Sequence, residues 1–280
     1  MLLQLPRQRQ LDLSRPKVMG ILNITPDSFS DGGRFIGKDA AISQARAMLA
    51  AGAAILDIGG ESTRPGAEEV SVQQELDRVL PVIEAIRSEL DCIISIDTCK
   101  TAVMKAAVAA GADIINDIKA LLDTGAVDFA ASAQVPVCLM HMQGQPRTMQ
   151  QSPVYQNVVK EVSDFLQHRA AVCVAAGIPR SQIILDPGFG FGKSLQHNYQ
   201  LLSQLSELLS LNYPVLAGMS RKSMIGQLVN VPPEERLAGS LACATIAVMK
   251  GARIIRVHDV KETVQAVAVA TATLFGVEHV

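Results

Sequence analysis

The stretch of the chain with the clearest chemical potential is residues 183–193, IILDPGFGFGK, where an apolar run stops at a carboxylate. Such a run is typical of a strand that is buried on both faces. Because an unpaired carboxylate is costly in apolar surroundings, we expect Asp186 to meet a polar partner at the mouth of a core. The glycines that follow allow backbone to come close to a ligand. A helix N-cap at Asp186, followed by glycines in a turn, explains the same residues equally well. This stretch alone therefore does not distinguish a ligand site from the start of a helix.

The same pattern recurs along the chain, since eight apolar runs end in polar or ionisable side chains. A helix N-cap explains any single Asp or Asn, but arginine, lysine and histidine are poor N-caps. Charges of both signs at these positions therefore indicate a polar ligand. In chain order the residues are Asn23, Asp57, Asp97, Asn116, His141, Asp186, Ser220 with Arg221 and Lys222, and Arg256 with His258.

The elements that position these residues alternate regularly from residue 17 onward. Eight strand–helix units in a row predict an α/β fold with a parallel sheet. Their total length predicts that the sheet closes into a single-domain (β/α)8 TIM barrel. The active site of such a barrel is expected at the carboxyl ends of the strands. An open doubly wound sheet is the rival. Residues 1–16 are expected to form an N-terminal cap segment or hairpin, and residues 17–280 the barrel. The expected strands are 17–25, 53–60, 92–98, 113–118, 136–142, 182–188, 214–220 and 252–259, and the expected helices are 38–52, 71–90, 100–110, 125–133, 154–176, 195–211, 222–250 with a break at 231–233, and 260–275.

Composition narrows the class of protein. The chain is 49% hydrophobic and 19% charged, as in compact globular proteins, and its net charge of -2 gives no electrostatic footprint for nucleic acid or an anionic membrane. The five cysteines form no CxxC pair, which favours reduced thiols in a cytoplasmic protein. The N-terminal residues lack the apolar core of a signal peptide, and no apolar run is long enough for a membrane span.

Two places suit an anion. Arg256 and His258 alternate with Val257, so both side chains point the same way, and a helix start follows them; this favours a phosphate or pyrophosphate. Lys222 and Ser223 begin another helix. Together with a phosphate, hard oxygen donors such as those of Asn23 and Asp27 suit Mg²⁺, which binds few protein ligands and keeps its waters.

The carboxylates of Asp97 and Asp186, with Asn116 between them in chain order, suit a nitrogen-rich heterocycle. A carboxylate pairs in bidentate fashion with an N–C–N edge, as it does with guanidinium, and a pterin has such an edge. Lys222 and Met140 are placed to contact the remaining faces of the ring.

Eight segments in order closely resemble the bacterial dihydropteroate synthases, over the chain from about Leu11 to the C-terminus. They are MGILNITPDSFSDGG, DIGGESTRPGA, SIDT, NDI, MHMQGQPRTMQ, LDPGFGFGK, GMSRKSMIG and RVHDV. The resemblance implies a (β/α)8 barrel, usually dimeric, that joins hydroxymethyl-dihydropterin pyrophosphate to para-aminobenzoate and releases pyrophosphate in folate synthesis. Sulfonamides compete with para-aminobenzoate in this family.

The resemblance also implies residue roles. Mg²⁺ is expected on Asn23, with Asp27 as a second candidate, and the catalytic groups are expected to be Asp97, Asp186, Lys222, Arg256 and His258. The pterin pyrophosphate pocket is expected to comprise Thr63, Asp97, Asn116, Met140, Asp186, Phe191, Gly218, Lys222, Arg256, Val257 and His258, and the para-aminobenzoate region Phe29, Ser62, Arg64, Pro65 and Ser223. The loops that carry Phe29 and Arg64 are polar and contain glycine, so we expect them to be mobile in the free enzyme.

Three other functions fit parts of the sequence. Pterin-dependent methyltransferases share the pterin-binding residues, but the STRPG and SRK segments and the lack of a corrinoid module argue against them. A paralogue that binds pterin without turnover is a second alternative. The third is a Schiff-base aldolase that uses Lys222, with Arg221 beside it to lower the lysine pKa.

Overall fold

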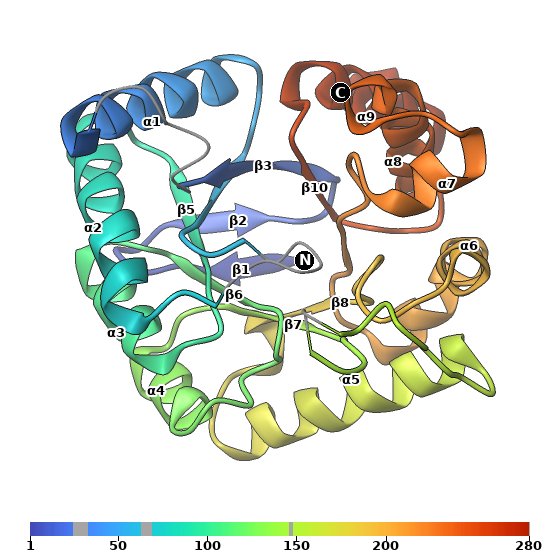
Figure 1. Cartoon of the computed structure of the whole chain (residues 1–280), viewed down its shortest axis with the longest axis horizontal. Helices are drawn as coiled ribbons and strands as arrows, with labels where there is room; N and C mark the ends of the chain where they lie inside the picture. Colours follow the sequence, from blue (N-terminus) through green and yellow to red (C-terminus); the bar gives the residue numbers. More distant parts are fainter. Residues whose placement is uncertain (25–32, 63–68, 146–147, 280) are drawn as a thin grey trace.

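A closed ring of parallel strands is the centre of the molecule (Figure 1). The computed structural model describes residues 1–24, 33–62, 69–145 and 148–279, and the side chains of residues 33–36 are not described. Within these residues the sheet order is β8-β7-β6-β5-β4-β3-β10-β9, and a parallel bridge between Leu185 and Val215 joins its two ends. The predicted barrel is therefore confirmed, and the open sheet is wrong. The strands are β3 (Lys17–Asn23), β4 (Ile55–Gly59), β5 (Ile93–Asp97), β6 (Ile114–Asp117), β7 (Val137–Met140), β8 (Ile183–Asp186), β9 (Leu216–Ala217) and β10 (Ile254–Val257).

Helices surround the strands as an outer ring (Figure 1). Ser71 caps α2 and forms the predicted capping box with Gln74. Some predicted boundaries are wrong: α1 starts before residue 38, and α5 starts only after Asn157, whose side chain accepts from the Lys160 N–H. The helices are α1 (Gly33–Ala50), α2 (Val72–Glu89), α3 (Thr101–Ala110), α4 (Ala126–Ala133), α5 (Val158–Ala175), α6 (Leu195–Ser203), α7 (Ser223–Val229), α8 (Leu237–Met249) and α9 (Val260–Phe275).

The helix predicted over residues 195–211 is two elements. After α6 the chain continues as a 3-10 helix, η3 (Leu205–Leu211). Leu205 and Leu208 are both fully buried, and their spacing of three residues matches the three-residue turn of a 3-10 helix. None of the described helices combines the length and the hydropathy that crossing a bilayer requires.

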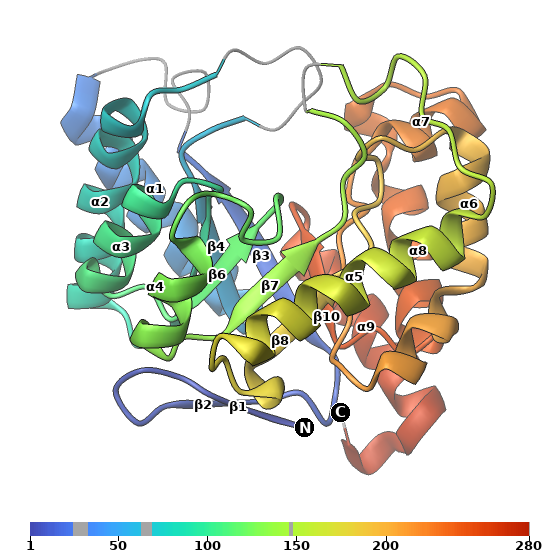
Figure 2. The same ribbon diagram turned by 90° about the horizontal axis from the view of Figure 1, so that it is seen from below.

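The amino-terminal end of the barrel is filled with apolar side chains. Each of the eight strands contributes one residue to this layer: Met19, Ile55, Ile93, Ile114, Cys138, Ile184, Leu216 and Ile254. An antiparallel hairpin, β1 (Leu2–Gln4) and β2 (Gln10–Asp12), packs four leucines against it, namely Leu3, Leu5, Leu11 and Leu13. Figure 2 shows the hairpin across the lower end of the barrel, with α7 at the opposite end. The polar strand ends therefore face away from a closed base.

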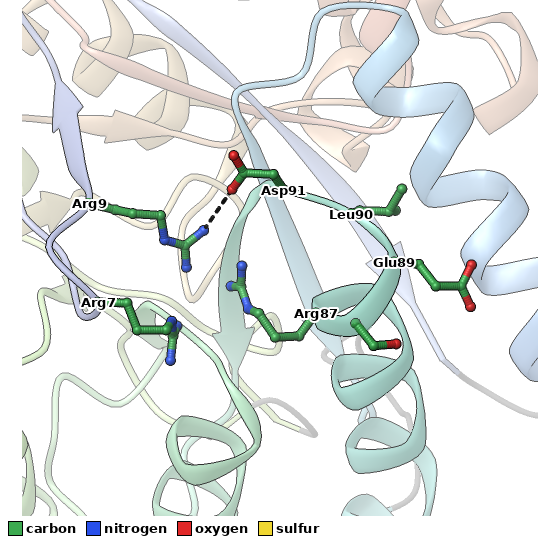
Figure 3. Close-up of a pocket in the computed structure, with 7 residues that line it drawn as sticks. Arg7, Arg9, Arg87, Glu89, Leu90 and Asp91 are labelled. Carbon is green, nitrogen blue, oxygen red and sulfur yellow. Dashed lines mark ion pairs between the residues drawn. The ribbon is translucent and has the colours of Figure 1, made fainter.

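A buried carboxylate attaches the hairpin to the barrel. Asp113, which is fully buried, accepts from Arg7 (2.5 Å), from Arg87 (2.6 Å), from Arg9 and from the Ile94 N–H (2.9 Å). Figure 3 shows the three arginines converging from the hairpin and from the end of α2, around a shallow pocket of about 440 Å³. Because their guanidinium groups also donate to the carbonyls of Gly111 and Cys92, we interpret this cluster as structural.

We predict that Asp113→Ala destabilises the fold strongly, because three guanidinium groups and a buried N–H lose their shared acceptor. The free energy of unfolding should fall by ~3–5 kcal/mol in urea denaturation. Asp91→Ala is the matched control, since this carboxylate is 98% exposed and lies 3.8 Å from Arg9; it should change the free energy by about 0.5 kcal/mol or less. Equal denaturation midpoints for both variants would contradict the interpretation.

Candidate active site

Strand register places three of the predicted residues, with Gly59 between two of them, in one row at the carboxyl end of the barrel. Asn23 pairs with Gly59, Gly59 with Asp97, and Asp97 with Asn116. Gly59 has no side chain between its neighbours: a Cβ there would lie 3.4 Å from Asp97 Cβ and 3.6 Å from Asn23 Oδ1. The row therefore brings the neutral amide oxygen of Asn23 and the carboxylate of Asp97 close together.

Arg256 lies inside the barrel between two carboxylates. Its Nε donates to Asp57 Oδ2 (2.6 Å) and its Nη2 to Asp97 Oδ2 (2.6 Å). Asn116 Nδ2 donates to the same Asp57 oxygen at 3.1 Å. Asp57 is fully buried, and its Oδ1 has no hydrogen-bond partner among the described residues. An unpaired carboxylate oxygen in the protein interior is costly, so it requires a hydrogen-bond donor that the described residues do not supply.

The charges in this group shift the pKa values of Asp97 and Arg256. Burial raises the pKa of Asp97 to about 7; the Arg256 charge opposes this effect and the nearby Asp57 carboxylate adds to it. Burial acts to lower the pKa of Arg256, but Asp57 and Asp97 outweigh it and the net pKa rises. The guanidinium thus stays charged, while the two carboxylates compete for one cation.

The row of strand ends with Arg256 forms one wall of the site. The second wall comes from β8 and the turn that follows it. Asp186 Oδ1 accepts the Gly188 N–H at 2.7 Å, and burial raises the pKa of this carboxyl. Lys222 Nζ donates to the Phe189 carbonyl at 2.5 Å and lies 4.6 Å from the centre of the Phe191 ring. Burial lowers the pKa of Lys222 to about 8. The predicted partners Asp186, Phe191 and Lys222 are therefore brought together.

An apolar cluster lies next to the charged groups. Met140 and Phe191 belong to it and are both buried, and its other buried members are Cys99, Ile118 and Met149. These residues follow or end strands β5, β6, β7 and β8, so they line the same end of the barrel. Apolar walls with a few polar groups at fixed positions are typical of pockets for planar small molecules.

The last two strands contribute the remaining predicted residues. His258 Nδ1 lies 3.1 Å from Ser220 Oγ, and a Cβ on Gly218 would lie 3.6 Å from Arg256 Cβ. Val257, by contrast, packs in the core between the strands and the helices. Its side chain therefore does not face the barrel interior, and its predicted place in the pterin pyrophosphate pocket stays a prediction.

The para-aminobenzoate region is represented only in part. Ser62 is the last described residue of its segment, and Ser223 is the exposed first residue of α7. The predicted residues Phe29, Thr63, Arg64 and Pro65, and the second metal candidate Asp27, lie outside the described residues.

Asp57 is the site residue to which sequence reasoning assigned no role. It ends an apolar run as Asp97 and Asp186 do, so the signal was present. The contact with Arg256 joins residues that are 199 positions apart, and only the closed barrel reveals it.

Comparison with known proteins agrees with this geometry. The family model described as "Pterin binding enzyme" matches residues 19–258. A dihydropteroate synthase from Escherichia coli (strain K12) is 58% identical over 269 residues, covering 96% of this chain and 95% of the relative, and one from Haemophilus influenzae is 57% identical over 263 residues, covering 94% and 96%.

Solved structures give the same result. The Yersinia pestis dihydropteroate synthase with a sulfonamide drug complex has a TM-score of 0.93 at 59% identity, covering 98% of this chain and 99% of the other. The Xanthomonas albilineans enzyme with 4-aminobenzoic acid has a TM-score of 0.90 at 50% identity, covering 96% of both chains. The fold, the row of polar strand ends and these similarities lead to one conclusion: the chain belongs to the pterin binding enzyme family, in the group of the dihydropteroate synthases.

Proposed function

We propose that the chain is a transferase that condenses hydroxymethyl-dihydropterin pyrophosphate with para-aminobenzoate, giving dihydropteroate and pyrophosphate in folate biosynthesis. The observation that carries this proposal is the buried carboxylate cluster around Arg256, with its unpartnered Asp57 oxygen. A pterin has the N–H groups that such a cluster requires. Solved relatives with 4-aminobenzoic acid and with 7,8-dihydropteroate support the choice of second substrate and product.

In this proposal the pterin lies between the two walls of the site. Asp97, Asn116 and Asp57 face its N–C–N edge, and Asp186 accepts from the other side. Lys222 and the Phe191 ring already lie next to each other, and Met140 belongs to the same apolar cluster as Phe191, so the three are placed around one planar ring. Binding therefore combines charge-assisted hydrogen bonds with apolar contact.

The reaction proceeds by departure of pyrophosphate, followed by amine attack. Arg256 and His258, with Thr63, hold the leaving group, and the carbon–oxygen bond to it breaks with both electrons going to pyrophosphate. The pterin-methyl cation that remains is stabilised by the buried carboxylates of Asp97 and Asp186. The aryl amine, held by Phe29, Ser62, Arg64, Pro65 and Ser223, then forms the new carbon–nitrogen bond with its lone pair and releases one N–H proton to the departed pyrophosphate. Positioning and electrostatics carry this reaction, and no protein nucleophile takes part.

We propose Mg²⁺ as the cofactor, with Asn23 as its ligand and Asp27 as a further candidate. The donor set fits a metal that receives most of its negative partners from phosphate, because Asn23 Oδ1 is a neutral oxygen and the nearby Asp97 carboxylate is engaged by Arg256. When bound, the ion would neutralise charge that develops on the pyrophosphate.

We further propose a cytoplasmic homodimer. All five cysteines are free and buried, as expected in a reducing compartment. Exposed apolar side chains occur on helices α7 and α8, and contact with a second copy of the chain would remove them from water. They are Leu228, Val229, Leu237, Ile246 and Met249. Sedimentation equilibrium of the protein and of Ile246→Glu tests this, since the substitution should shift the protein toward the monomer.

The decisive experiment is a turnover assay with the pterin pyrophosphate, para-aminobenzoate and Mg²⁺, followed by pyrophosphate release. Product formation supports the proposal and refutes a paralogue that only binds pterin. Binding of the pterin without turnover would overturn the catalytic part. Borohydride trapping with a carbonyl substrate separates out the aldolase alternative, which requires a covalent adduct on Lys222.

We predict that Asp186→Asn weakens pterin binding while the fold persists, because a charge-assisted contact is lost in a desolvated pocket. The loss should be ~2–5 kcal/mol by calorimetry. Asp128→Asn, the same chemical change on the exposed surface of α4, is the control and should leave binding unchanged. Near-normal pterin affinity in a folded Asp186→Asn protein would contradict the assignment.

We also predict that activity requires a divalent ion and that Asn23→Ala raises the Mg²⁺ concentration needed. The metal affinity in the presence of pyrophosphate should fall by about ten- to a hundredfold, measured by titration calorimetry. Full activity of the unaltered protein in excess chelator would refute the metal role. An unchanged Mg²⁺ titration for Asn23→Ala would refute the ligand assignment alone.

A further inference from the structure

Lys193 is a buried cation that the reaction as described does not use. It lies between β8 and α6, and only 2% of the residue is exposed. Its Nζ lies 3.0 Å from His141 Nδ1, 2.9 Å from the Gly188 carbonyl oxygen and 3.0 Å from that of Phe191. These three acceptors match the three N–H donors of an ammonium group. The His141 carbonyl, at 3.3 Å, is a fourth and longer contact.

The electrostatics are consistent with that arrangement. Burial and the Lys193 charge lower the pKa of His141 to about 3, so the imidazole is neutral and its Nδ1 can accept. Burial also lowers the pKa of Lys193 to about 7; Asp186 opposes the shift and Lys222 adds to it. A lysine is held in such surroundings only where its donors are satisfied.

Two of the acceptors of Lys193, the carbonyls of Gly188 and Phe191, lie on the turn that forms one wall of the site, residues 188–192. Gly188 and Gly192 have φ angles of +69° and +62°, and a Cβ on them would lie 2.0 Å from the His141 carbonyl and 2.2 Å from the Gln143 carbonyl. The turn therefore packs directly on the segment after β7. Glycine-rich backbone has many alternative conformations, so contacts from outside the turn have to select one of them.

This turn presents three groups to the proposed pterin pocket. The Gly188 N–H fixes the Asp186 carboxylate, the Phe189 carbonyl accepts from Lys222, and the Phe191 ring lies under the Lys222 ammonium. The two carbonyls that Lys193 binds, those of Gly188 and Phe191, belong to the same short turn as these groups. Holding those carbonyls inward leaves the Gly188 N–H and the Phe189 carbonyl directed at Asp186 and Lys222.

We propose that Lys193 is a positioning residue for pterin binding: its buried ammonium holds the turn 188–192 in the conformation that presents Asp186, Lys222 and Phe191 to the ring. This inference rests on the proposed function, since it takes the pterin as the ligand of that wall. Lys193 touches no substrate and takes part in no bond-making step.

The test compares Lys193→Met with the unaltered protein. Methionine fills the space of the lysine stem but donates no hydrogen bond, so the carbonyls of Gly188 and Phe191 can rotate away. The dissociation constant and the KM for the pterin substrate should rise by about tenfold or more, whereas the KM for para-aminobenzoate should stay within about twofold. Calorimetry and steady-state kinetics give these values, and circular dichroism checks the fold.

Gln182→Met is the matched control. Gln182 is also buried and donates to two carbonyls, those of Gln4 and Gln134, at the opposite end of the barrel. It should lower the melting temperature without changing pterin affinity. A purely structural role for Lys193 predicts the same behaviour for both variants, so a folded Lys193→Met protein with normal pterin affinity would overturn the proposal.

A milder variant covers the case in which Lys193→Met does not fold. Tyr155→Phe removes one further support of the turn, the hydrogen bond from the Tyr155 hydroxyl to the Gly192 carbonyl at 2.8 Å. It should weaken pterin binding by about two- to fivefold, and unchanged affinity would overturn the premise that the conformation of this turn controls pterin binding, and the proposal with it. Turnover by the unaltered protein is measured first. Its absence would count against the proposed function, whereas the variant-to-wild-type ratio of pterin affinity tests Lys193 alone.

Discussion

The mouth of the barrel depends on one buried guanidinium, that of Arg256, which lies between Asp57 and Asp97. Two carboxylates this close in a protein interior repel each other unless a cation lies between them. One cation does not fully satisfy two carboxylates, and an Asp57 oxygen is left without a partner among the described residues. The cluster thus holds more acceptor oxygens than the described donors satisfy, which is the basis for proposing a ligand rich in N–H groups.

The same strands form an apolar amino-terminal end and a charged carboxyl end of the barrel. At the base, one apolar side chain per strand meets the leucines of the hairpin, and Asp113 with its arginines locks the hairpin in place. This burial stabilises the fold at the base. The carboxyl ends hold charged groups whose desolvation opposes stability.

Within the polar end, contacts from outside the turn 188–192 hold that turn. The turn 188–192 is held by Lys193, by Tyr155 and by Asn198, which accepts from the Gly190 N–H at 2.7 Å. The groups proposed to recognise the pterin are thus preorganised by a shell of buried contacts that do not touch the ligand. Preorganisation of this kind strengthens binding by removing the entropy cost of ordering the site.

The sequence by itself determined the alternation of strands and helices, the capping box at Ser71, and the polar residue at each strand end, because these features depend on neighbours a few positions away. It misplaced the start of α5, where the N-cap side chain of Asn157 decides among several possible starts. Only the tertiary structure decided that Asp57 joins Arg256 and that Lys193 binds His141. Those partners lie far apart in the chain, and they meet because closure of the barrel and packing of successive loops bring them together.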